Sequence, residues 1–209
     1  MIRRPPRSTL SSSSAASDVY KRQALNKDSH TALKQACDEA EADDNVRVVV
    51  IRGASPPPAP EGKRQKPAAF AAGADISEFA GKNSDDVRPF FEDNAWERVW
   101  NLSKPTIAMV DGFALGGGTE LALSCGLINS VTTPEELKET TMKLAENIAK
   151  KSPYTTKVAK RAVRASLDLP FSEGVRMERS EFVALFDTED KEIGVNAFLN
   201  RESPKWLGK

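Results

Sequence analysis

A strand-like run that enters three consecutive glycines and leaves as a helix is the feature that most restricts how this chain can fold. The run KPTIAMVDGFA begins at Lys104, is rich in apolar and β-branched residues, and predicts a buried strand started by Pro105. Glycines 116–118 follow, and the apolar spacing over Glu120–Ser124 predicts a short helix. A buried strand that passes directly into a helix is typical of α/β folds.

The rest of the sequence extends this pattern. Further strands are expected in VRVVVIRGA, from Val46, and in AAFAAGADI, ending at Gly73. Apolar spacing predicts helices over residues 28–44, 84–102, 134–151, 153–167, 172–186 and 188–199. Asp28 or Ser29 is the expected cap of the first helix and Thr188 that of the last. We therefore expect an α/β core followed by a helical C-terminal region.

Composition excludes several classes of function. Thirty basic and thirty acidic residues balance, so no excess of charge favours nucleic acid or an anionic membrane. One histidine makes a Ser-His-Asp triad or a histidine-rich metal site an unfavoured interpretation. Two cysteines are too few for a disulfide scaffold and favour a reducing compartment. No apolar run approaches the ~20 residues of a membrane-spanning helix.

The glycine turn directs main-chain N–H groups at one point. GFALGGGTE matches neither the P-loop pattern nor G-x-G-x-x-G, so a nucleotide phosphate site is not favoured. An oxyanion site remains, with Glu120 in the first helical turn as a candidate general base on water. The alternative is a tight turn without function, with an acid that the helix dipole alone favours.

A second turn of the same design lies earlier in the chain, in FAAGADISEF (Phe70–Phe79). Together with DGFALGGGTELALSC, the preceding VRVVVIRGA and the tail FDTEDKEIGVNAFLNRESPKW, it resembles the enoyl-CoA hydratase/isomerase (crotonase) family from Ala24 to about Leu207. The resemblance implies an incomplete crotonase-like ββα spiral core over 24–126 and a helical region over 127–209.

The resemblance also implies roles for residues. The main-chain amides of Ala74 and Gly117 are similar to a two-donor oxyanion hole for a thioester carbonyl, and Glu120 to the first of two water-activating glutamates. The expected contacts with coenzyme A come from Ala72, Gly73, Asp75, Ile76 and Gly116. The implied reaction is reversible addition of water to trans-2-enoyl-CoA, giving 3-hydroxyacyl-CoA, as in β-oxidation of fatty acids. No metal or redox cofactor is expected, and coenzyme A is part of the substrate. Homotrimers or hexamers are expected through the C-terminal helices.

The second glutamate of the family is missing. Cys125 joins Gly126 directly, where family members have several dozen further residues, including that acid. We therefore expect poor activity or none. The alternatives are an enoyl-CoA isomerase, another acyl-CoA enzyme of the family, or a non-catalytic remnant that binds coenzyme A.

Residues 1–23 stand apart, because they are rich in Arg and Ser and hold one acid, Asp18. The segment resembles translated sequencing-adaptor DNA and is interpreted as non-native or disordered, in the place of the family's first β-hairpin. A mitochondrial transit peptide has similar composition, so the cytoplasm is the expected location and the mitochondrial matrix the alternative.

Five further side chains attract attention as candidates. His30 is interpreted as a solvated or capping residue, and Cys125 as a small apolar packing group. Phe91, Trp96 and Trp100, at helical spacing, are interpreted as core.

Overall fold

The computed structural model describes residues 24–54, 58–59, 61–62, 68–126 and 129–209. Residues 1–23 lie outside the described part of the chain, so their interpretation stays a prediction. Most of the proline-rich segment 55–67 and the side chains of Ile76, Phe90 and Phe91 lie outside it as well.

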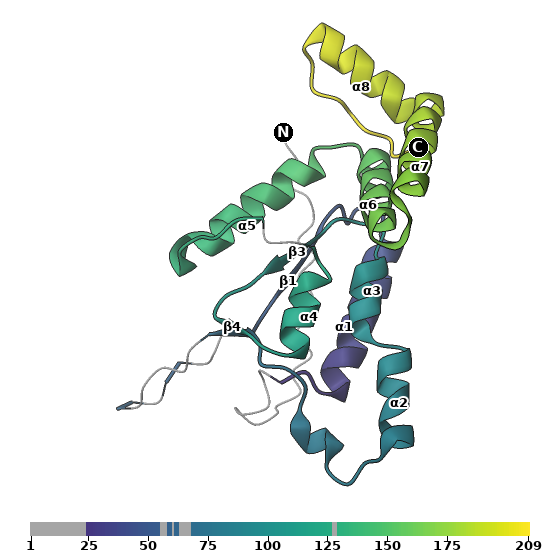
Figure 1. Cartoon of the computed structure of the whole chain (residues 1–209). Helices are drawn as coiled ribbons and strands as arrows, with labels where there is room; N and C mark the ends of the chain where they lie inside the picture. Colours follow the sequence, from purple (N-terminus) through teal and green to yellow (C-terminus); the bar gives the residue numbers. More distant parts are fainter. Residues whose placement is uncertain (1–23, 55–57, 60, 63–67, 127–128) are drawn as a thin grey trace.

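The expected α/β core and helical C-terminal region are both present (Figure 1). The elements in chain order are α1 (Lys27–Ala42), β1 (Val49–Arg52), β2 (Ala69–Ala71), the 3-10 helix η1 (Ile76–Phe79), α2 (Ser84–Glu92), α3 (Ala95–Asn101), β3 (Thr106–Met109), β4 (Phe113–Ala114), α4 (Gly117–Leu123), α5 (Pro134–Ala149), α6 (Pro153–Asp168), α7 (Phe171–Ala184), η2 (Leu185–Asp187) and α8 (Glu189–Asn200). The division at residues 126 and 127 into two domains stays a prediction.

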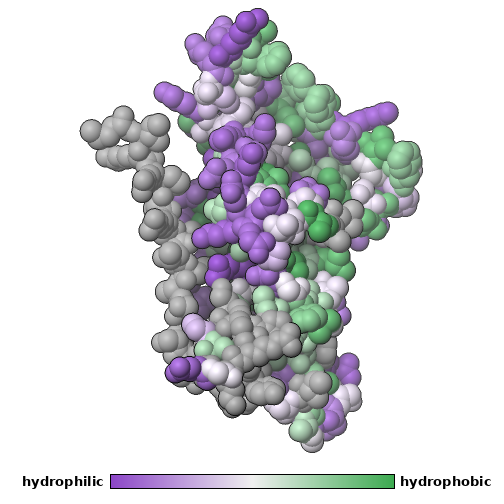
Figure 2. Space-filling view, turned by 90° about the vertical axis from the view of Figure 1, so that its left-hand side faces the viewer, coloured by the Kyte–Doolittle hydropathy of each residue, from purple (hydrophilic) through white to green (hydrophobic). Residues whose placement is uncertain are grey.

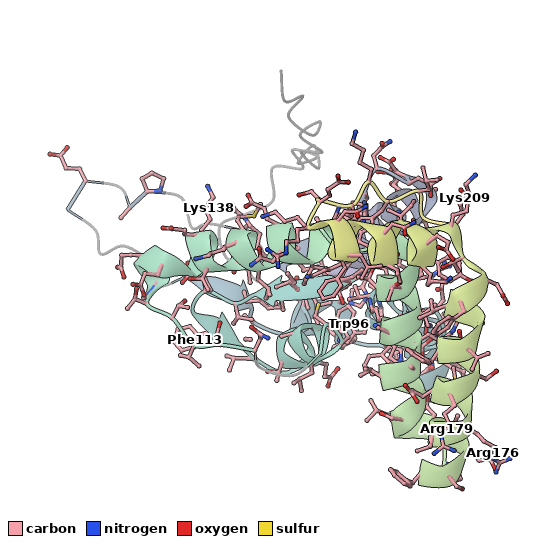
Figure 3. All side chains as sticks on the ribbon, turned by 90° about the horizontal axis from the view of Figure 1, so that it is seen from above. Trp96, Phe113, Lys138, Arg176, Arg179 and Lys209 are labelled. Atoms are coloured by element: carbon pink, nitrogen blue, oxygen red, sulfur yellow. The ribbon has the colours of Figure 1, made fainter. Side chains whose placement is uncertain are left out.

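The described strands form two parallel pairs. β1 pairs with β3, with Val49 opposite Thr106 and Arg52 opposite Met109, and β2 pairs with β4. α5 packs against β3, whereas α4 packs against β2 and lies on the other side of the strands (Figures 1 and 3). Among the described residues β3 pairs with β1 alone, so its second edge is unpaired. Its face is nevertheless partly covered by α5.

A compact apolar cluster joins α1 and α3 to the strands. Its buried members are Cys37, Phe70, Ala71, Val99, Leu102 and Leu121. Val99 and Ala95 are completely inaccessible to solvent, which fixes one face of α3 against the core. Cys125 packs on the edge of the same cluster, as expected for a small apolar group.

The run from Lys104 to Ala114 is not one strand, as the sequence predicts, but two strands in different sheets. Gly112 adopts φ +74° between them, and a β-carbon there would lie 1.9 Å from the carbonyl oxygen of Ala68. The chain therefore turns sharply where it crosses from the first pair of strands to the second.

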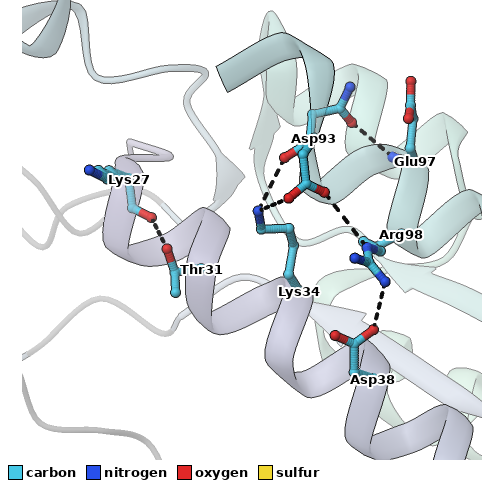
Figure 4. Close-up of polar contacts among 8 residues, drawn as sticks. Lys27, Thr31, Lys34, Asp38, Asp93, Glu97 and Arg98 are labelled. Atoms are coloured by element: carbon cyan, nitrogen blue, oxygen red, sulfur yellow. Dashed lines mark hydrogen bonds and ion pairs between the residues drawn. The ribbon is translucent and has the colours of Figure 1, made fainter. Parts of the chain in front are cut away.

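The single helix predicted over 84–102 is likewise wrong, because it divides into α2 and α3 at Asp93 and Asn94. The Asn94 side chain accepts a hydrogen bond of 2.8 Å from the amide of Glu97 and begins α3. The Asp93 carboxylate forms an ion pair with the ammonium of Lys34 in α1, at 2.8 Å (Figure 4). The break therefore lets α3 dock on α1.

Helix caps explain most other boundaries. Asn26 caps α1, in place of the predicted Asp28 or Ser29, by accepting from the amide of Ser29 at 2.9 Å. Thr188 caps α8 as predicted, accepting from the amide of Lys191. No helix in the described part of the chain is long and apolar enough to cross a membrane.

The C-terminal tail is held by one buried carboxylate. Asp190 in α8 accepts hydrogen bonds from the amides of Leu207 (2.7 Å) and Gly208 (3.0 Å) and from the Ser152 hydroxyl (2.5 Å). Its side chain is almost fully buried. The indole N–H of Trp206 adds a bond of 2.7 Å to the carbonyl of Lys150, so the tail closes over the start of α6.

Many apolar side chains remain exposed on the C-terminal helices. Figure 2 shows hydrophobic residues along the upper and right-hand parts of one face of the molecule, beside a hydrophilic centre. The most exposed on α6, α7 and α8 are Val163, Leu167, Phe171, Val183, Phe198 and Leu199.

Candidate active site

The two glycine-containing turns predicted from the sequence lie next to each other. Because β2 and β4 pair in parallel, the two segments that follow them leave the sheet in the same direction. The amide of Leu115 donates to the carbonyl of Ala71 at 2.9 Å. A β-carbon at Gly73 would lie 3.2 Å from the Leu115 carbonyl oxygen and 4.0 Å from the Gly117 nitrogen. The segments holding Ala74 and Gly117 are therefore in contact.

The Ala74 amide is oriented by its neighbour. The carbonyl of Gly73 accepts a 2.7 Å hydrogen bond from the amide of Leu25. The next peptide N–H belongs to Ala74 and points the opposite way, because the two groups share one trans peptide unit. No hydrogen bond among the described residues uses this N–H, and Ala74 is exposed. It is thus a donor available to a ligand.

The Gly117 amide is available for a different reason. It is the first residue of α4, whose first amides have no partner within the helix. The amides of Gly118 and Thr119 turn back to the carbonyls of Leu115 and Gly116, both at 2.9 Å. Within the described part of the chain, no such bond uses the amide of Gly117.

Two of the three adjacent glycines have a physical requirement of their own. Gly116 adopts φ +49° and ψ −124°, which side chains rarely allow. A β-carbon at Gly118 would lie 2.3 Å from the carbonyl oxygen of Ala71, so only glycine lets α4 approach β2. The sequence predicts a helix that starts at Glu120. The helix instead begins at Gly117, because Gly117 and Gly118 are already helical.

Glu120 lies in the first turn of α4 and is exposed. No hydrogen bond or ion pair among the described residues engages its carboxylate. Its position on the helix that presents the Gly117 amide agrees with the predicted neighbourhood. Its role as a base stays a prediction.

The other predicted ligand contacts line the same turns. Ala72 and Gly116 are exposed, and Gly73 is buried between the two segments. The Asp75 carboxylate caps η1 by accepting from the amide (3.0 Å) and hydroxyl (2.6 Å) of Ser77. The main chain of Ile76 begins η1. Asp75 therefore shapes the turn, whatever else it binds.

Trp96 and His30 were not assigned to this site from the sequence. The His30 ring stacks on the Trp96 indole at a centroid distance of 4.3 Å and an angle of 17°. Burial lowers the pKa of His30 below its ordinary value, opposed by the nearby Glu78 carboxylate. A β-carbon at Gly117 would lie 3.2 Å from Cζ2 of Trp96, so the indole belongs to the glycine turn as well as to the core.

A cationic cluster surrounds Cys125 at the end of α4. The Lys160 ammonium donates to the carbonyl of Lys104 at 2.5 Å and to the Thr106 hydroxyl at 3.3 Å. Burial, with the nearby Arg164 guanidinium, lowers the pKa of Lys160 to about 8. Burial also raises the pKa of the Cys125 thiol to about 11, so it is a poor nucleophile.

A cavity lies away from these turns. A cavity of about 180 Å³ opens between the ends of β1 and β3 and the start of α5, with Arg52, Asp111 and Lys138 in its wall. None of the described residues in that wall belongs to the glycine turns. We place the candidate site at the turns, because two main-chain amides without a hydrogen-bond partner among the described residues lie there on segments in contact. Within the described residues no group of His, Cys, Asp or Glu side chains is arranged to hold a metal ion.

Comparison with known proteins identifies the family of the chain. The family model described as Enoyl-CoA hydratase/isomerase matches residues 19–126 and 122–209. A "Probable enoyl-CoA hydratase, mitochondrial" of Dictyostelium discoideum is 31% identical, over 68% of this chain and 72% of its own length. A "Probable enoyl-CoA hydratase" of Rhizobium meliloti (strain 1021) is 33% identical, over 66% and 76%.

Solved structures agree with this result. The crystal structure of an enoyl-CoA hydratase subunit I from Geobacillus kaustophilus HTA426 aligns with a TM-score of 0.73 and 28% identity, covering 89% of this chain and 90% of that one. The chain belongs to the enoyl-CoA hydratase/isomerase family, and its fold is crotonase-like.

The alignments also contain a gap. The short-chain-enoyl-CoA hydratase of Clostridium acetobutylicum aligns over 237 positions but with only 85% of this chain. That share of 209 residues is about 178, so about 59 aligned positions have no counterpart here. The two family matches meet at residues 122–126, where the sequence predicts a missing segment after Cys125.

Proposed function

We propose that this chain binds acyl-CoA thioesters through the amides of Ala74 and Gly117 and hydrates trans-2-enoyl-CoA far more slowly than a hydratase with two glutamates. The observation that carries the proposal is the contact between two turns that each leave one main-chain N–H without a partner. Family membership supplies the substrate class.

The chemistry follows from the positions of these groups. Two amide donors on the thioester oxygen stabilise the enolate that forms when water adds to Cβ, and one such donor is worth about 3–4 kcal/mol. Glu120 takes a proton from the attacking water. Completion needs a proton at Cα. The acid that resemblance assigns to this step lies in the missing segment, and a positioned acid typically contributes about 10²–10⁴-fold.

Binding and turnover should therefore separate. We expect calorimetry to show binding of crotonyl-CoA, while the enoyl absorbance of the same mixture falls at least about 100-fold more slowly than with a complete hydratase. Turnover at the full hydratase rate would refute the expected loss, and absence of binding would refute the site.

A matched pair of variants tests the Gly117 amide. Gly117→Ala and Gly117→Pro both add a β-carbon beside Trp96, but only proline removes the N–H. Proline is tolerated at the first position of a helix, so α4 should persist in both. We expect the proline variant to bind crotonyl-CoA about fivefold or more weakly than the alanine variant. Equal affinities would contradict the proposed donor.

A non-catalytic protein that binds coenzyme A is the second candidate. The exposed Glu120 carboxylate, without a partner among the described residues, favours it, because a general base in a hydratase must hold a water in place. Binding with no measurable loss of enoyl absorbance over days would identify this case.

Three further properties belong to the same proposal. We propose that no cofactor takes part, and that the protein works in the cytoplasm or, if residues 1–23 are a transit peptide, in the mitochondrial matrix. We also propose that it self-associates as a trimer or hexamer, because large apolar side chains of α6–α8 are exposed to solvent. Phe198, which is 84% exposed, is the natural test: Phe198→Ser should lower the mass measured by light scattering.

A further inference from the structure

The cavity of about 180 Å³ lies at the carboxyl ends of two paired parallel strands. Arg52 and Met109 are partners at the ends of β1 and β3, so the chain beyond each strand leaves the sheet at the same edge. The start of α5 forms another side of the space, with Pro134 and Leu137 in the wall. In open α/β sheets, ligands bind preferentially outside such carboxyl ends.

Part of the wall is apolar and belongs to the packed interior. Ala69 and Met109 are buried, with 5% and 9% of their surfaces exposed. Leu137, which lines the cavity from α5, is half-buried. A ligand with an apolar end would cover the remaining surface of these side chains and gain from its removal from water.

Three charged side chains stand in the same wall without partners. Arg52, Asp111 and Lys138 are exposed, and none of them forms a hydrogen bond or ion pair with any residue that the structure describes. Elsewhere in the chain a lysine near the end of an element does pair, as Lys34 does with Asp93 at 2.8 Å. Two basic groups and one acidic group give the wall a net positive charge.

The acids at the start of α5 are not part of this wall. Glu135 and Glu136 lie in the first turn of the helix, but neither lines the cavity. The Glu136 carboxylate accepts a hydrogen bond of 3.0 Å from the Thr133 hydroxyl. Asp111 is therefore the single acid in the wall, as far as the described residues form it.

The volume restricts the size of a ligand. A cavity of about 150 Å³ inside a protein admits benzene. A space of about 180 Å³ therefore suits a molecule of about six to eight non-hydrogen atoms, and a coenzyme A thioester is far too large for it.

We propose that this cavity binds a small organic monocarboxylate, with its charged group near Arg52 and Lys138 and its apolar end on Ala69 and Met109. A guanidinium can hold a carboxylate through two parallel hydrogen bonds, and the ammonium adds a second positive charge. Asp111 opposes any further negative charge, so a dicarboxylate or a phosphate fits less well. The site goes beyond the proposed function, because its described wall includes neither glycine turn.

Butyrate is the probe, since it has the required size, and butyramide is its uncharged counterpart. The amide resonances of Gly53 and Ala54, which line the cavity, are followed by NMR while each compound is added to the full chain. We expect a saturable shift with butyrate, with a Kd on the order of 1 mM. Butyramide should bind about fivefold or more weakly, because hydrogen bonds to charged groups are the stronger ones.

Two substitutions should move the affinity for butyrate in opposite directions. Lys138→Met removes an attraction and should weaken binding about threefold, whereas Asp111→Asn removes a repulsion and should strengthen it about threefold. Lys143→Met, at an exposed position of the same helix outside the wall, is the matched control and should bind as wild type does. All three positions are exposed, so each variant should fold, and its amide spectrum verifies this.

Each other outcome overturns the proposal. Unmoved Gly53 and Ala54 resonances in butyrate would show that the cavity holds no carboxylate. Equal affinities for butyrate and butyramide would remove the role of charge. Equal losses in Lys138→Met and Lys143→Met would assign the attraction to the net charge of the chain, and tighter binding of butylamine than of butyrate would make Asp111 the dominant group.

Discussion

The carbonyl of Gly73 accepts a hydrogen bond of 2.7 Å from the amide of Leu25, and the same peptide unit directs the Ala74 N–H toward the opposite side. A contact outside the two turns thus sets the direction of one proposed oxyanion donor. The residue that supplies it lies just before α1, far from the turns in sequence.

Removal of the Leu25 amide should therefore weaken ligand binding. Leu25→Pro eliminates the donor, whereas Leu25→Ala keeps it and loses only side-chain packing. We expect the dissociation constant for crotonyl-CoA, measured by calorimetry, to be about fivefold higher in the proline variant than in the alanine variant, since one hydrogen bond contributes about 1 kcal/mol. Similar constants would show that Ala74 is oriented without Leu25.

Gly118 should be among the least replaceable residues of the core. Gly118→Ala places a β-carbon 2.3 Å from the Ala71 carbonyl oxygen and 2.7 Å from the Ala71 β-carbon. Such overpacking typically costs about 1–3 kcal/mol in the free energy of unfolding, measured in urea. Gly174→Ala is the control in α7, where a β-carbon meets nothing within 4 Å. That change should stabilise by about 0.5–1 kcal/mol, and a loss equal to that at Gly118 would contradict the packing argument.

Asp190 should be critical for the C-terminal tail. Asp190→Ala leaves the Leu207 and Gly208 amides and the Ser152 hydroxyl without their acceptor. We expect a loss of about 2–4 kcal/mol in the free energy of unfolding, with faster amide exchange at residues 207 and 208. Asp187→Ala, at an exposed position, should change neither quantity. Unaltered exchange in the Asp190 variant would show that Trp206 alone holds the tail.

Lys160 should make stability depend on alkaline pH. Its pKa is about 8 in the folded chain and 10.5 ordinarily, so between these values the unfolded chain binds more protons. Stability therefore rises with pH from about 8 to 10.5, and below pH 8 the buried charge opposes folding. Because the amine is partly exposed, solvent screening reduces the effect to on the order of 1 kcal/mol.

Two variants isolate that contribution. Lys160→Met should remove the rise between pH 8 and 10, measured by urea unfolding, while Lys157→Met on the same helix should leave it in place. A rise of equal size in Lys160→Met would assign it to other groups, such as Lys104, whose pKa burial also lowers.

The order of strands and helices follows from local patterns, and so does the pair of turns. The β-branched run of β1, the Pro134 start of α5 and the Thr188 cap are all visible in the sequence. The division of Lys104–Ala114 into two strands is not, because it depends on the approach of Gly112 to Ala68, a contact between distant segments. Periodicity identifies apolar residues but does not identify what they meet.

The same limit applies to the site. The resemblance to the family, rather than the glycine pattern, singles out the amides of Ala74 and Gly117, and their role stays a prediction. Trp96 is interpreted from spacing as core, and it does contact the core. Its second contact, with Gly117, arises only when α3 docks on α1.

The chain at Gly126 faces open solvent. This residue is exposed, adopts φ +126°, and a side chain there would meet no atom within 4 Å. Surface points of this kind accept inserted domains, because the new chain enters and leaves without disturbing the packed elements. The junction between Cys125 and Gly126 is thus a surface point at which the chain can accommodate an inserted segment while α4 stays anchored on β2.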